Sequence, residues 1–256
     1  MSNRPTPALP AEAFERNGPA AADQDSPRRA ASDAVRDLID VLVSREVPDE
    51  VLVEGAAVLG EVARRFEEAA TPGKRVRQSP DLTGHPQDYF ASSPMNGINN
   101  PMSLPLHLWG AVDEHGDAVI RGRAIFSLAF EGPPTCVHGG IVALCFDEIL
   151  GNANLIAGRP GMTGTLTIRY RRPTPLMTTL ELEAKQIGVD GRKIKTVGTI
   201  KVDGEVTAEA EAIFIEVLPE QMLGIVSSNA DRAGSVVVDP ELQRLVAERD
   251  ATSGSA

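Results

Sequence analysis

A turn followed by a long apolar run lies near the middle of the chain, at residues 131–150. These residues read Glu-Gly-Pro-Pro-Thr-Cys-Val-His-Gly-Gly-Ile-Val-Ala-Leu-Cys-Phe-Asp-Glu-Ile-Leu. Two consecutive prolines forbid a helix at the beginning, and the run after His138 is long enough for a helix buried on most sides. The stretch therefore predicts a buried central helix that begins near His138 and that the rest of the fold must cover.

Two glycines and a carboxylate in this helix favour a catalytic interpretation. Gly139 and Gly140 lie at the helix start, where free N–H groups and the helix dipole bind an oxygen that becomes negative during a reaction. Asp147 lies nine residues after His138 inside the apolar run, where a carboxylate is costly unless it is paired or used. We interpret the glycines as groups that polarise a carbonyl, and Asp147 as the residue that supplies or activates the attacking oxygen.

Structural roles compete with this interpretation at each position. Asp147 could instead pair with Arg169, although its place in an apolar helix favours a functional role. His138 is about equally consistent with a structural turn residue. Glu148 points about 100° away from Asp147 around the helix, and we interpret it as structural.

Composition indicates one substantial core with appendages, because 42% of the 256 residues are hydrophobic. The net charge of −11 argues against nucleic acid or an anionic membrane as the main partner. Two cysteines, Cys136 and Cys145, are too few for a disulfide framework and are interpreted as packing residues in a reduced setting. We find no signal-peptide core and no apolar run near the roughly 18–20 residues of a membrane span. We expect a cytoplasmic protein that binds neither nucleic acid nor a membrane.

Five segments are expected along the chain. Residues 1–30 are rich in proline and in small and charged residues, which is typical of disorder. Residues 31–73 are expected to form a helical hairpin, and residues 74–103 a binding loop or lid. The main domain is expected over residues 104–218, followed by a C-terminal tail over residues 219–256.

Two helices are predicted within the hairpin. A pattern of apolar residues at helical spacing begins at Ser32, Pro48 interrupts it, and a second pattern runs from Asp49 through Ala70. Both helices carry mixed charge, which favours packing on the main domain or on a second subunit over reading DNA.

The main domain changes from strands to the central helix and back to strands. Two dipeptides, Asp190-Gly191 and Asp203-Gly204, are typical of two-residue hairpin turns. A helix this apolar must be covered, so we expect an α+β fold in which the sheet wraps around it. The expected strands are one from about Leu104, then Ala118–Ala129, Met162–Arg171, Thr178–Val189, Arg192–Val202 and Val206–Val217.

The motif His138-Gly139-Gly140 with an acid nine residues after the histidine is preceded by Glu131-Gly132-Pro133-Pro134 and followed by a strand that ends in Tyr-x-x-Pro. This combination, over roughly residues 104–217, resembles the hotdog-fold acyl-CoA thioesterases of the phenylacetyl-CoA thioesterase (PaaI-like) group. The resemblance implies an antiparallel sheet of about six strands wrapped around one long central helix, here preceded by an N-terminal helical segment. It also implies hydrolysis of acyl-CoA to free acid and CoA, by a homodimer or dimer of dimers whose sites are shared between chains.

The resemblance implies roles for individual residues. Asp147 matches the catalytic carboxylate, which acts as general base on water or as nucleophile. Gly139 or Gly140 matches the backbone N–H that binds the thioester oxygen, and His138 matches the residue that helps to fix the thioester and the turn. Thr163 falls where the group places a Ser or Thr that positions the water, reached across the subunit interface.

Several cations are candidates for binding the phosphates of CoA. We expect this role for Arg169, Arg171 and Arg172, although each is as consistent with a solvated charge at a strand end. Asn96, in the preceding loop, is expected to contact the substrate or CoA. Many members of the group have an asparagine shortly before the histidine, where Gly132 stands here. A thioester is activated with a good leaving group, so we expect no metal and no cofactor besides the CoA thioester itself.

Three other functions remain as alternatives. A hotdog hydratase or dehydratase would pair an Asp with a His spaced for work on the acyl chain, which this spacing does not suggest. A non-catalytic acyl-CoA sensor would act on a partner through the N-terminal helices, but the expected basic DNA-reading helix is not found in residues 33–70. An inactive scaffold is disfavoured because the glycine pair and the acid are both present.

Overall fold

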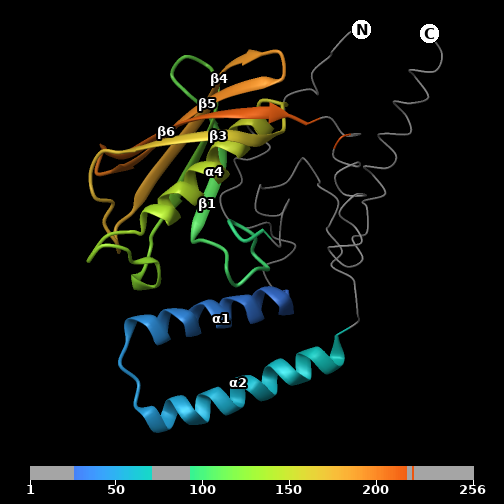
Figure 1. The fold of residues 1–256 in the computed structure, drawn as a ribbon, viewed down its shortest axis with the longest axis vertical. Coiled ribbons are helices and arrows are strands. Elements are labelled where there is room, and N and C mark those ends of the chain that lie inside the picture. The colour runs from blue at the N-terminus through green and yellow to red at the C-terminus, as the bar shows by residue number, and fades with distance from the viewer. Residues whose placement is uncertain (1–25, 71–92, 218–220, 222–256) are drawn as a thin grey trace, which may run out of the picture.

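The computed structural model describes residues 26–70, 93–217 and 221 of the 256-residue chain. A helical hairpin lies below an α+β domain in which one helix is wrapped by a sheet (Figure 1). The predicted N-terminal disorder, much of the predicted lid and the C-terminal tail fall mainly outside the described residues.

Six strands form a single antiparallel sheet with the order β1-β2-β4-β5-β6-β3. This confirms the predicted sheet and places β3 at one edge. The strands are β1 (Leu106–Val112), β2 (Ala118–Ala124), β3 (Gly161–Tyr170), β4 (Leu180–Asp190), β5 (Lys193–Val202) and β6 (Glu205–Glu216).

The predicted central helix is α4 (Gly139–Ile156), which contacts all six strands. Its side chains Phe146, Ile149 and Leu150 are completely buried and form the middle of the core. The helix is longer and more apolar than predicted: its 18 residues have a mean hydropathy of 1.3, which by length and composition is enough to cross a membrane. Half of them are buried inside the sheet, as is usual for the core helix of a soluble domain. The fold is therefore the predicted α+β hotdog.

Tight turns connect the last three strands. Asp203 and Gly204 alone connect β5 to β6, with φ angles of 50° and 80° that fit a type I′ turn. The turn between β4 and β5 is one residue later than predicted, because Asp190 pairs with Lys193 and encloses Gly191 and Arg192.

Two element boundaries differ from the prediction. Helix α1 (Pro27–Ser44) begins five residues before Ser32, because proline suits the first position of a helix; residues 27–30 are therefore helical. Strand β2 ends at Ala124 instead of Ala129. The chain there forms the 3-10 turn η2 (Leu128–Phe130). Ser127 caps this turn, because its side chain accepts a hydrogen bond from the Ala129 N–H.

Helix α1 connects the hairpin to the hotdog domain. It packs on η2, and Arg36 donates hydrogen bonds to the carbonyl oxygen of Asn100 (2.6 Å) and to the hydroxyl of Ser103 (3.1 Å). The second helix, α2 (Asp49–Ala69), contains no buried residue. The hairpin therefore contacts the domain through α1.

Candidate active site

The start of α4 presents one unoccupied N–H group. His138 is the N-cap residue, and its Nδ1 accepts a hydrogen bond of 3.0 Å from the Gly140 N–H. Its carbonyl oxygen accepts from the N–H groups of Ile141 and Val142. The Gly139 N–H makes no hydrogen bond to any described residue. Of the two predicted glycines, Gly139 therefore has the N–H without a partner among the described residues, and the Gly140 N–H is held by the histidine.

A steric contact explains why glycine stands at position 132. A Cβ atom on Gly132 would lie 2.7 Å from the Cα of His138, which is too close for any side chain. The His138 N–H donates a hydrogen bond of 2.9 Å to the Phe130 carbonyl oxygen, which keeps the histidine against this turn. An asparagine side chain cannot occupy position 132 without moving the turn away from His138.

Asp147 and Thr163 form a direct pair within one chain. The Thr163 hydroxyl donates a hydrogen bond of 2.7 Å to Asp147 Oδ1. The resemblance implied that Thr163 is reached across a subunit interface, and the structure adds that Asp147 and Thr163 lie on the same side of such an interface, because one chain supplies both. A register shift between Thr163 and Thr165 leaves Gly164 as a bulge, which turns the Thr163 side chain relative to the rest of β3.

The two adjacent carboxylates of α4, Asp147 and Glu148, differ in burial in a way that the sequence did not predict. Asp147 is exposed in the single chain, although its place in an apolar run suggested a buried group. Glu148 is half-buried, and burial is the main reason that its pKa lies above the usual 4.5. Its structural interpretation fits the bonds of 2.8 and 2.9 Å that the Asn152 amide donates to its carbonyl and carboxylate oxygens.

Asn96 lies in the interior beside Glu148. Its amide lowers the pKa of Glu148 and so favours the charged carboxylate, although its polar atoms make no hydrogen bond of normal geometry to described residues. A buried side chain is not open to CoA, and the structure does not bring it together with the arginines. Cys145 is buried nearby, and burial followed by the charge of Glu148 raises its pKa to about 12, so it is no thiolate nucleophile.

Tyr170 contacts the start of α4 and was not among the predicted site residues. Its hydroxyl donates a hydrogen bond of 2.8 Å to the Gly139 carbonyl oxygen. A Cβ on Gly139 would be 3.7 Å from the Tyr170 ring, so the ring lies directly over the first helical residue. The tyrosine of the Tyr-x-x-Pro ending was visible in the sequence, but nothing there indicated that it reaches the helix start.

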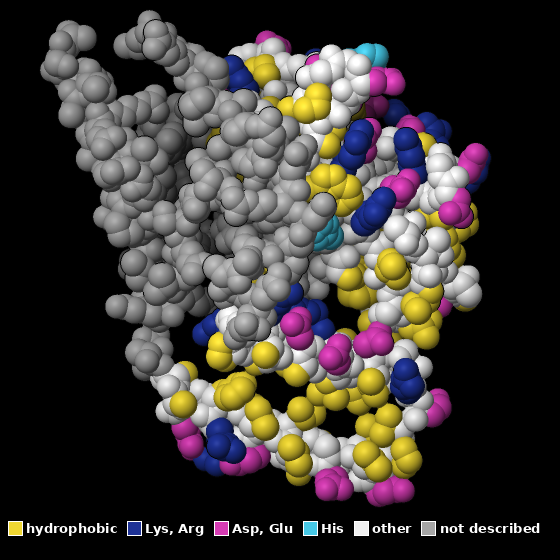
Figure 2. Space-filling view, turned by 180° about the vertical axis from the view of Figure 1, so that it is seen from behind, with side chains coloured by type: hydrophobic (Ala, Val, Ile, Leu, Met, Phe, Trp, Pro, Cys, Tyr) yellow, Lys and Arg dark blue, Asp and Glu magenta, His cyan; other side chains and the backbone are white. Residues whose placement is uncertain are grey.

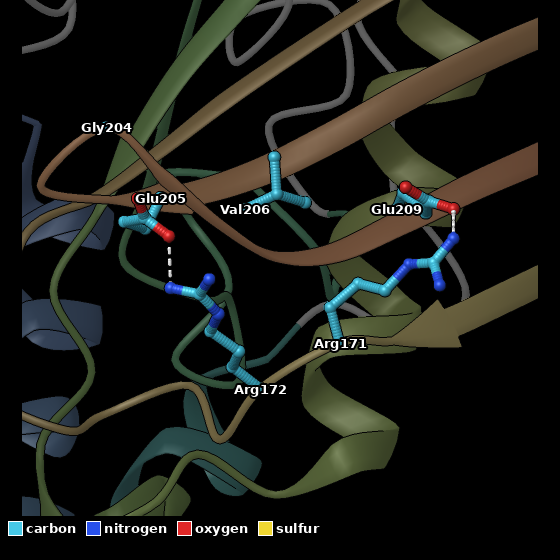
Figure 3. A pocket seen from close by; sticks show the side chains of 6 residues that line it. All are labelled: Arg171, Arg172, Gly204, Glu205, Val206 and Glu209. Carbon is cyan, nitrogen blue, oxygen red and sulfur yellow. Dashed lines mark hydrogen bonds and ion pairs between the residues drawn. The ribbon is translucent and has the colours of Figure 1, made fainter.

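The three candidate arginines lie at and just beyond the end of β3, and each is paired with glutamate. Arg169 contacts Glu209 and Glu211. Arg171 contacts Glu209, and Arg172 contacts Glu205. Figure 3 shows the open pocket that Arg171 and Arg172 line. Their partners on β6, Glu209 and Glu205, line the same pocket. All three arginine side chains are more than half exposed, and their charge is balanced locally.

No group of three or more His, Cys, Asp or Glu residues with the geometry of a metal site occurs within the described parts of the chain. Helix α4 thus offers the Asp147 carboxylate and a backbone N–H at its start, and strand β3 offers the Thr163 hydroxyl. Such a set suits hydrolysis of an activated carbonyl.

Comparison with known proteins agrees with the fold and the motif. No protein-family model matches the chain. The crystal structure of a thioesterase superfamily protein superimposes with a TM-score of 0.67 and 33% sequence identity, over 84% of this chain and 98% of that protein. Acyl-coenzyme A thioesterase THEM4 of Mus musculus is 35% identical over 38% of this chain and 42% of its own length. The corresponding protein of Xenopus laevis is 34% identical over 35% and 41%.

The chain thus matches about two fifths of the length of these curated relatives. The solved relative, by contrast, is matched over nearly its whole length at 33% identity. The resemblance of the central motif to hotdog thioesterases is confirmed, and the chain belongs to the thioesterase superfamily.

Proposed function

We propose that this protein hydrolyses acyl-CoA thioesters to the free acid and CoA, without a metal or a further cofactor. The observation that carries the proposal is the hydrogen bond from Thr163 to Asp147 at the sheet edge. Asp147 lies on the helix whose first N–H group, that of Gly139, has no partner among the described residues. The names of the curated relatives support the same substrate class.

The spacing of the two groups along α4 supports a site that is shared between two chains. Gly139 and Asp147 are eight residues apart, which is about 12 Å along a helix that rises about 1.5 Å per residue. An oxyanion donor and an attacking oxygen must both lie within roughly 3–3.5 Å of the same carbonyl group. The rise along the helix is larger than this separation, so we expect Gly139 of one subunit to act with Asp147 of another.

The exposed edge of the sheet supports the same dimer. Strand β3 is the end strand, most of its residues are exposed, and an unpaired edge of ten residues is a template for another strand. Leu144 and Met162 are 42% and 51% exposed and lie on the same two elements as Asp147 and Thr163. A second copy on this edge would cover both apolar side chains and remove water from the site.

In this mechanism each residue has a distinct task. Asp147 takes the proton of a water molecule as the water attacks the thioester carbon. In the nucleophilic alternative its carboxylate attacks that carbon, and water then hydrolyses the resulting acyl-aspartate anhydride to the free acid and restores Asp147. The Thr163 hydroxyl fixes the carboxylate, and the Gly139 N–H stabilises the oxyanion until the C–S bond breaks and the CoA thiolate leaves. The general base contributes about 10²–10⁴-fold and the backbone donor about 10²–10³-fold. Tyr170 and His138 act indirectly by fixing the first turn of α4.

The arginines are proposed to bind the phosphates of CoA by exchanging partners. Arg171 and Arg172 now pair with glutamates in an open pocket, and a phosphate would compete for the same guanidinium groups. Substitution by alanine should therefore raise KM for acyl-CoA several-fold and leave kcat nearly unchanged, because these contacts are the same in substrate and transition state.

The test is CoA release from a panel of aliphatic and aromatic acyl-CoAs by the native protein and by Asp147→Ala. Glu61→Ala, which removes an exposed carboxylate of α2, is the control. We expect turnover of at least one class, its loss in Asp147→Ala and none in the control. Tight binding of an acyl-CoA without turnover would favour a sensor instead. Equal turnover by Asp147→Ala would show that Asp147 is not the catalytic carboxylate.

A further inference from the structure

Helix α2 presents an apolar stripe that nothing in the described chain covers. Its large apolar side chains recur at helical spacing, and Val62 and Phe66 are 39% and 64% exposed. A surface helix of this type is normally stabilised by burial of its stripe, and a 21-residue helix without a single buried residue has no such stabilisation. The stripe consists of Val51, Val58, Leu59, Val62 and Phe66.

Helix α1 exposes a second stripe beside its contact with the hotdog domain. Val35, Ile39 and Leu42 are each more than 40% exposed, whereas Ser32 is buried and Arg36 bonds to the loop before β1. The domain therefore occupies one side of α1 and leaves these residues open. Figure 2 shows hydrophobic side chains along both helices of the hairpin and openings between the two helices. The helices of one chain do not cover the stripes of each other.

The charges of the hairpin argue against several kinds of partner. On the side of α2 away from the stripe, Arg64 forms ion pairs with Glu61 and Glu68 of the same helix. Acidic residues outnumber basic ones between residues 27 and 69, so the hairpin does not attract a phosphate backbone or an anionic membrane. These ion pairs lie away from the stripe, so an apolar helical surface of the same kind can pack on the stripe without bringing the charges into the contact.

We propose that the hairpin pairs with the hairpin of a second copy of this chain, so that α1, α2 and their two counterparts form a four-helix bundle. Two antiparallel helices with matching stripes are self-complementary about a twofold axis, which is the commonest symmetry of soluble oligomers. The shared active site proposed above, on which this point rests, would also hold the hairpins of two chains at high local concentration. The pairing goes beyond hydrolysis and does not require it.

The test is inter-chain cross-linking at matched positions of α2. Cys136→Ser removes the half-buried thiol, while Cys145 is buried. Val62→Cys then places a thiol on the stripe. Val53→Cys, nine residues earlier and so about 180° around the helix, places one on the opposite side at a site that is 73% exposed. Each purified full-length variant is treated at low micromolar concentration with a short bis-maleimide.

We expect a band of twice the chain mass from Val62→Cys, at least tenfold stronger than from Val53→Cys. Adding Leu59→Glu to Val62→Cys should abolish it. Equal cross-linking at both positions, or none at Val62→Cys, would overturn the pairing. A further contradicting result is a Val62→Cys protein that forms no cross-link and whose thiol also fails to react with a monofunctional maleimide. In that case another part of the same chain would cover the stripe. CoA release measured on the same samples reports on hydrolysis separately.

Discussion

Helices α4 and α2 have similar lengths, 18 and 21 residues, but opposite surroundings. Nine residues of α4 are buried under the sheet, and none of α2 is buried. Helix α4 is apolar on most sides, so a curved sheet must wrap it, whereas α2 is apolar along one stripe and needs only one partner surface. The hotdog domain thus completes its core within one chain, and the hairpin leaves its apolar surface for a second chain.

The same contrast indicates that the hotdog domain determines the stability of the chain and that the hairpin determines how two chains assemble. The hotdog domain holds Asp147, Thr163 and Gly139 on elements whose packing is internal to the chain. The hairpin contributes the buried Ser32 and the Arg36 bonds to the domain and little else. Substitutions in the two regions should therefore differ in size and in the property that they change.

The largest contrast is expected between two phenylalanines. Phe146→Ala removes a completely buried side chain of α4 and should lower the free energy of unfolding by about 3–5 kcal/mol. Phe66→Ala, on the exposed stripe of α2, should change the unfolding of the hotdog domain by less than about 0.5 kcal/mol. Urea unfolding followed by the fluorescence of Trp109, the single tryptophan, measures both. Equal losses would show that the two regions form one cooperative unit.

A smaller effect is expected at Glu148. Glu148→Ala leaves the buried amides of Asn152 and Asn96 without their carboxyl neighbour and should cost about 1–3 kcal/mol. Glu148→Gln should be milder, because the amide oxygen can still accept from Asn152.

Glu148 also gives a pH signature. Burial raises its folded pKa above the usual 4.5, so its stabilisation is fully present below 4.5 and is lost as the pH rises through the folded pKa. Thermal unfolding between pH 4 and 8 should show this decline in the native protein and not in Glu148→Gln. Parallel curves for the two proteins would contradict the assignment of a raised pKa.

Removal of one hydroxyl at the sheet edge should affect catalysis and leave stability nearly unchanged. Thr163→Val abolishes the hydrogen bond of 2.7 Å to Asp147 and should lower kcat about tenfold, which is about 1.4 kcal/mol. Thr199→Val, on strand β5, serves as the matched control and should retain full activity. Steady-state hydrolysis of one acyl-CoA by both variants is sufficient, and equal kcat values would remove Thr163 from the site.

The smallest effect concerns a surface ion pair of the hotdog domain. Lys185 is the main reason that the pKa of Asp113 is lowered to about 2. This stabilisation is present above the usual value of 3.8 and is lost as the pH falls through about 2. Lys185→Ala should lower Tm by only about 1 °C at pH 7, and the difference should disappear near pH 2. A Tm difference that is constant with pH would point to lost packing of the lysine stem.

Sequence patterns predicted the elements whose causes are local. The Asp203-Gly204 turn follows from residues that tolerate positive φ, and the central helix follows from its unbroken apolar run. The early start of α1 was missed because Pro27 was interpreted as a mark of disorder, although proline also begins helices.

The candidate site was only partly predictable because its contacts join distant segments. The His-Gly-Gly motif indicated Gly139 and Gly140, but only the structure shows that the histidine ring occupies the Gly140 N–H. Asp147 and Glu148 are neighbours in the sequence, and helix periodicity alone did not reveal which one faces the core. The contact between Tyr170 and Gly139 spans 31 residues and leaves no periodic signal.

The most direct test of the proposed chemistry is the kcat of Asp147→Asn with one acyl-CoA that the native protein hydrolyses. The substitution keeps the shape of the side chain and its bond from Thr163 but removes the basic carboxylate. We predict a loss of at least about 100-fold at unchanged Tm and unchanged oligomeric mass. A kcat within a few-fold of the native value would contradict the role of Asp147 and the site built around it.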